Sequence, residues 1–136
     1  MLTRPKRRCS SIWKGALPLA TLDDIQAALE SIDDAVYYGV ASKVEETDPW
    51  NYTVFSRDNT SPKENLTGYS ERFLVAVVRE NYVPEGMYLD VIEAMAKIPG
   101  MKLDRSRDIE YLYTAKPGTR DVVEMMSVYF TKGRKP

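Results

Sequence analysis

The sequence predicts an α+β fold of two layers, in which two helices pack on one face of a mostly antiparallel five-stranded sheet. Three observations predict this class. The chain has 136 residues, which is enough for one domain with its own core. Helical and strand-like segments follow in the order α-β-β-β-α-β-β. The last two strands are separated by Lys116–Thr119, which has proline second and glycine third, as a type II turn requires.

Both helices are predicted from apolar residues at helical spacing. The first covers about Leu22 to Ser31 and follows Thr21, which with Asp24 resembles a capping box. The second begins at Pro84, where a missing N–H has no cost. It ends before Pro99-Gly100, since neither residue continues a helix well.

Five segments rich in β-branched and aromatic residues are predicted as strands. They are residues 35–42, with Gly39 as a bulge, and residues 50–57, 71–81, 109–115 and 121–130. The segment Asp58–Gly68 contains Pro, Gly, Asn and Ser, and it is predicted as a long mobile loop. The strand over residues 71–81 is apolar on both faces at its centre, which indicates a central position in the sheet.

The last strand raises the question of what covers its second face. One face would carry Val123, Met125, Ser127 and Tyr129, and the other Val122, Glu124, Met126, Val128 and Phe130. Two helices cover only one face of a sheet, and an exposed apolar face usually marks an interaction surface. We therefore predict a self-association interface, with an arginine of the third strand pairing with the glutamate. Its residues are Glu124, Met126, Val128, Phe130, Arg72 and Arg79. The alternative is that Glu124 lies at a sheet edge and reaches water.

The residue types argue against catalysis. The chain has no histidine and one cysteine, Cys9, which excludes Ser-His-Asp and Cys-His mechanisms and an internal disulfide. Neither GxGxxG nor GxxxxGK[ST] occurs. The pairs Asp23-Asp24 and Asp33-Asp34 flank the first helix, where helix-end solvation explains them better than metal binding. We predict no enzymatic activity, no cofactor, no metal and, since no apolar run is long enough, no membrane span.

Charge is unevenly distributed along the chain. Residues 1–18 carry five of the 19 basic residues and no acid, so the remainder is acidic. We predict a flexible arm over residues 1–18, a single domain over 19–132 and a frayed tail over 133–136. The alternative for the arm is contact with an acidic partner or nucleic acid. The nine tyrosines could stack on bases, but that needs a basic groove, so we predict no sequence-specific nucleic-acid binding.

Several strings occur together in a recognisable order. They are YYG (37–39), PWNYxVFxR (49–57), GY (68–69), VRENYVPE (78–85), IPGMKL (98–103), IEYxYxxKP (109–117) and VVEM (122–125). In this order they resemble the small tail-terminator or tail-completion proteins of long-tailed bacteriophages and prophages. The resemblance covers roughly Leu22 to Lys132, and the basic arm departs from it.

This resemblance implies a non-enzymatic virion protein, assembled in the bacterial cytoplasm, that forms a ring, typically hexameric, at the head-proximal end of the tail tube. Its partners would be further copies of itself, the major tail tube protein and the head-tail connector. It also implies that the Asp58–Gly68 loop is a docking element. The docking residues we expect are Arg57, Asp58, Lys63, Glu64 and Tyr69. The alternatives are another connector or tail assembly protein, a small inhibitor, or a metal-dependent nuclease, which the acidic body argues against.

Overall fold

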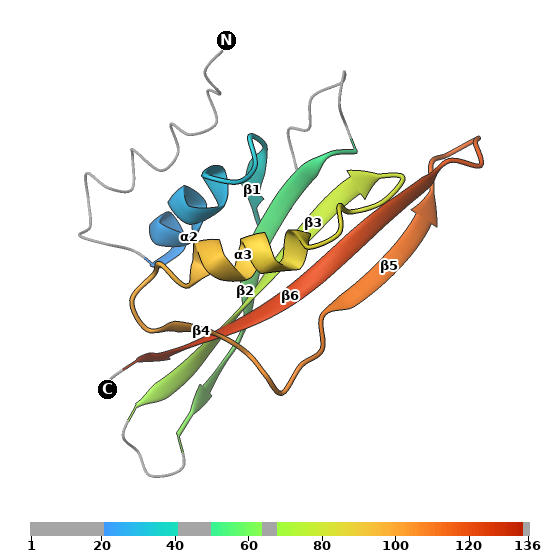
Figure 1. Cartoon of the computed structure of the whole chain (residues 1–136). Coiled ribbons are helices and arrows are strands. Elements are labelled where there is room, and N and C mark those ends of the chain that lie inside the picture. Colours follow the sequence, from blue (N-terminus) through green and yellow to red (C-terminus); the bar gives the residue numbers. More distant parts are fainter. Residues whose placement is uncertain (1–20, 41–49, 64–67, 135–136) are drawn as a thin grey trace.

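A computed structural model describes residues 21–40, 50–63 and 68–134, which form an α+β fold. Helices α2 (Thr21–Glu30) and α3 (Met87–Met95) lie side by side on one face of a six-stranded sheet (Figure 1). The predicted α+β class is confirmed. The predicted arm, residues 1–18, lies outside the described residues.

The sheet is mixed, with one parallel pairing and four antiparallel ones. Its strands are β1 (Val36–Tyr38), β2 (Tyr52–Pro62), β3 (Tyr69–Glu80), β4 (Met101–Leu103), β5 (Glu110–Ala115) and β6 (Val122–Arg134). The order across the sheet is β1-β2-β3-β6, and β1 runs parallel to β2. Because β3 occupies one side of β6, β4 and β5 share the other side, each pairing with a different half of β6.

Several predicted boundaries were wrong. The second helix begins at Met87 and not at Pro84, because Gly86 with a φ of 82° stands at its N-cap. The expected loop over residues 58–68 is strand as far as Pro62, because β2 and β3 continue as a hairpin of paired polar residues (Figure 1). The expected frayed tail is also strand as far as Arg134, because β6 pairs with both β3 and β4 there. Gly39 is no bulge, since β1 ends at Tyr38 and Gly39 follows with a φ of 81°.

The strand count was also wrong, because β4 is a sixth strand of three residues directly after Pro99-Gly100. The predicted turn between the last two strands is present. The N–H of Thr119 donates to the carbonyl of Lys116 at 3.0 Å, and Gly118 has a φ of 75°, as the third position of a type II turn needs.

The core lies between the helices and one face of β3 and β6. Cross-strand partners on this face are Val77 with Met126, Val75 with Val128 and Phe73 with Phe130. Ile25 and Leu29 of α2 and Val91 and Met95 of α3 belong to the same buried cluster.

The predicted interface at Met126, Val128 and Phe130 is therefore wrong. All three side chains are 0–1% exposed, because this is the face that the helices cover. The opposite face of β6 carries Met125, Ser127 and Tyr129, and neither described helix lies on it (Figure 1). We call it the open face.

Candidate interaction site

Arg79 and Glu124 are cross-strand partners on the helix-covered face, but each is bound elsewhere. Arg79 Nη2 lies 2.9 Å from Asp33 Oδ2, and its Nη1 donates to the carbonyls of Tyr52 and Val78. Asp33 also accepts a hydrogen bond from Thr53 at 2.6 Å. Arg79 thus ties the segment after α2 to the sheet, which is an internal role and not the predicted intermolecular one.

Arg72 is likewise used within the fold, on the open face. Its Nη1 donates to Asn59 Oδ1 at 2.8 Å and to Ser61 Oγ at 2.9 Å, and its Nε lies 3.7 Å from Asp104 Oδ2. These contacts hold the β2–β3 hairpin against the segment after β4. Arg72 therefore does not pair with Glu124, which lies on the other face.

The predicted docking residues lie at the β2–β3 hairpin. Asp58 is engaged, because Arg107 Nη1 binds its Oδ2 at 2.8 Å, while the Arg107 guanidinium stacks 3.7 Å from the centroid of the Tyr129 ring. Arg57, Lys63 and Tyr69 are exposed at the surface. Glu64 lies outside the described residues.

The open face carries an apolar strip between two polar ends. At one end, Arg107 stacks on Tyr129. At the other end, Lys116 pairs with Glu80 and its Nζ lies 6.0 Å from the centroid of the Trp50 ring. The strip consists of Tyr52, Val54, Leu74, Met125 and Leu112. The first four are half-buried, and Leu112 is 58% exposed.

Strand β5 is exposed along its whole length. All six of its residues are exposed, and in the part of the chain that the structure describes it pairs only with β6. Its sequence EYLYTA has neither the lysine nor the proline that commonly protects edge strands. The sequence predicted this strand but not its place at the edge. Edge position depends on which strand pairs with the second side of β6.

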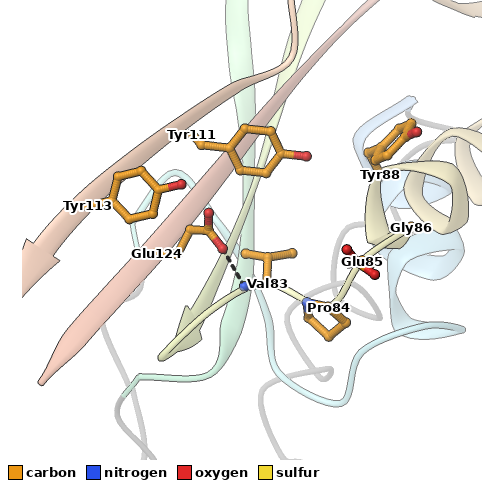
Figure 2. A pocket seen from close by; sticks show the side chains of 8 residues that line it. All are labelled: Val83, Pro84, Glu85, Gly86, Tyr88, Tyr111, Tyr113 and Glu124. Carbon is orange, nitrogen blue, oxygen red and sulfur yellow. Dashed lines mark hydrogen bonds between the residues drawn. The ribbon is translucent and has the colours of Figure 1, made fainter.

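An open hollow of about 420 Å³ lies between β5 and α3 (Figure 2). It is lined by Val83, Pro84, Glu85, Gly86, Tyr88, Tyr111, Tyr113 and Glu124. Tyr111 and Tyr113 project from β5 beside Glu124 of β6, whereas Glu85 and Tyr88 lie on the helix side (Figure 2). The pairing register of β5 with β6 places both tyrosines at the hollow. Tyr113 is the cross-strand partner of Glu124, and Tyr111 is the cross-strand partner of Met126.

Glu124 is the buried polar group of this hollow. It is only 7% exposed, and its Oε1 accepts a hydrogen bond of 2.6 Å from the N–H of Val83. A hydrogen bond to Glu124, with some dehydration and the charge of that carboxylate, raises the pKa of Tyr113 above its usual range. Burial, followed by the Glu124 charge, raises the pKa of Tyr111 as well.

No protein-family model matches the chain, and a search of curated proteins finds no significant match. Across residues 21–40, 50–63 and 68–134, no helix is long and apolar enough to cross a membrane. The same residues contain no group of three or more acidic, cysteine or histidine side chains placed to hold a metal ion.

Proposed function

We propose that this protein is a non-enzymatic structural component of a phage or prophage tail. It acts as a tail terminator, whose copies form a ring that caps the tail tube and offers a joining surface to the head connector. The observation that carries this proposal is strand β5, which is exposed on both faces and presents Tyr111, Leu112 and Tyr113 at an unprotected edge. Aromatic and apolar side chains at a free edge favour contact with another chain.

A ring requires each copy to use two different surfaces. The edge at β5 has six residues and runs antiparallel to its neighbour, whereas the opposite edge is the three-residue, parallel strand β1. A contact in which β5 of one copy meets a different surface of the next copy is heterologous, and such contacts close into rings when their rotation permits. The exposed Arg57, Lys63 and Tyr69 at the β2–β3 hairpin are available to the tube or the connector.

The test uses two leucines of nearly equal exposure on different elements. Leu112 on β5 is 58% exposed and Leu89 on α3 is 56% exposed. We expect Leu112→Asp to prevent ring formation, because a charge placed in an apolar contact is dehydrated without a partner. We expect Leu89→Asp to assemble as the wild type does. The measurement is mass by light scattering over a wide concentration range, with electron microscopy of the largest species.

Circular dichroism of both variants checks that the monomer stays folded. A wild-type protein that remains monomeric at every concentration, alone and with purified tail tube protein, would overturn the ring. If Leu112→Asp has the same mass as the wild type, β5 does not take part in the contact between copies.

A further inference from the structure

The hollow between β5 and α3 combines negative charge with aromatic rings. Among the described residues that line it are two carboxylates, Glu85 and Glu124, and three tyrosines, but no lysine or arginine. The carboxylates come from different sides, one from β6 and one from the segment before α3 (Figure 2). A wall of this composition is complementary to a cation.

Glu124 contributes a carboxylate that is not neutralised by its neighbour in the sheet. Its cross-strand partner is Arg79, whose guanidinium instead binds Asp33 at 2.9 Å. The N–H of Val83 donates to Oε1 of Glu124, and Tyr113 of β5 lies beside this carboxylate as its cross-strand partner. Because a buried anion without a cation is unfavourable, a positive group that enters the hollow would be stabilised.

The N-terminus of α3 opposes this preference only in part. Gly86 precedes the helix, and the helix dipole places about half a positive charge there. Glu85 lies in the same segment and offsets that partial charge. With the carboxylate of Glu124 added, the wall remains negative.

We propose that this hollow binds the guanidinium group of an arginine side chain presented by a partner protein. The planar guanidinium can stack on a tyrosine face while its donors reach carboxylates on two sides. Tyr111 and Tyr113 are 41% and 65% exposed, so each ring still offers free surface. A lysine ammonium concentrates its charge at one point and fits two separated carboxylates less well. Binding of an arginine in this hollow does not require that the ring exists.

The test is a binding titration of the full chain with N-acetyl-arginine amide, followed by the backbone amide signals in NMR. N-acetyl-citrulline amide is the control ligand, because it has nearly the same shape and no charge. We expect the arginine compound to shift the amides of Val83, Tyr111 and Tyr113 at millimolar concentration. The citrulline compound should leave them in place, and N-acetyl-lysine amide should bind more weakly.

Glu124→Gln removes the charge but keeps an oxygen for the Val83 N–H, so we expect binding at least about tenfold weaker. Glu93→Gln removes the same charge from an exposed position of α3 outside the hollow and should bind as the wild type does. If Glu124→Gln fails to fold, Tyr111→Leu on the exposed strand supplies a second variant with the same expected loss. Equal shifts with the citrulline compound, or shifts elsewhere on the surface, would overturn the proposal.

Discussion

Two buried carboxylates are held in different ways, and only one of them faces a hollow. Asp104 Oδ1 accepts hydrogen bonds from the N–H and the hydroxyl of Ser106, which closes a tight turn after β4. Its Oδ2 is buried near Arg72 and has no hydrogen-bond partner in the described part of the chain. Glu124 uses one oxygen for the Val83 N–H and borders the hollow. Asp104 is thus structural, whereas Glu124 can also meet a ligand.

We expect Asp104→Asn to destabilise the protein at neutral pH by about 1 kcal/mol. The hydrogen bonds from Ser106 lower the pKa of Asp104, with help from Arg72 and Arg107 and against the effect of burial. A folded-state pKa below the unfolded one stabilises above about pH 4 and loses that effect as pH falls through the folded pKa. The difference in the free energy of unfolding between wild type and variant, measured in urea, should therefore be smaller at pH 3 than at pH 7.

Asp108→Asn is the matched control, because Asp108 is exposed in the same connection between β4 and β5. This variant should differ little from the wild type at either pH. If Asp104→Asn lowers the free energy of unfolding by the same amount at pH 7 and at pH 3, the charge of Asp104 does not contribute to stability.

At the scale of elements, the sequence could predict where most helices and strands lie. The helical spacing of Ile25 and Leu29, and of Val91 and Met95, marks buried stripes that the structure confirms. The hairpin beyond Arg57 was missed, because its polar residues pair with each other and show no apolar alternation. Strand β4 was missed because three residues are too few to show a period.

The side of the sheet that the helices cover could not be predicted. Both faces of β6 are largely apolar, so alternation alone does not say which face packs under α2 and α3. Large side chains lie on both faces, since Leu74 and Tyr129 are on the open one. Phe73 and Phe130 lie on the covered face. The same ambiguity hid the hollow, which depends on the registers of β5 and β6 and on the position of α3.

Two valines on the covered face of β6 test whether Val128 is packed beneath the helices. Val128→Ala should cost about 2 kcal/mol, because Val128 is fully buried and the substitution leaves a cavity. Val122→Ala, on the same strand but 41% exposed, should change stability by less than about 0.5 kcal/mol. The measurement is the free energy of unfolding in urea for both variants. Equal effects would mean that Val128 is not packed beneath the helices.

At the scale of the whole molecule, the chain's own residues cover the helix side of the sheet, whereas they leave the β5 side exposed. The helix-covered face is closed by a continuous buried cluster that involves both helices and the central strands. The β5 edge, the apolar strip of the open face and the tyrosine-lined hollow all retain exposed apolar or aromatic surface. The β5 edge and the hollow lie beside β6, and the apolar strip runs across the open face from β2 to β5. A partner that covered them would stabilise the folded chain.

Assembly through β5 should therefore make thermal stability depend on concentration. Ring formation binds only the folded chain, and a concentration 100 times the dissociation constant adds about 2.7 kcal/mol. For a domain of this size we expect the wild-type Tm to rise by on the order of 5–10 °C between dilute and concentrated samples. Leu112→Asp should keep one Tm throughout, and Leu89→Asp should follow the wild type. Differential scanning fluorimetry over the same dilution series measures all three, and a wild-type Tm that stays constant would contradict assembly through any surface.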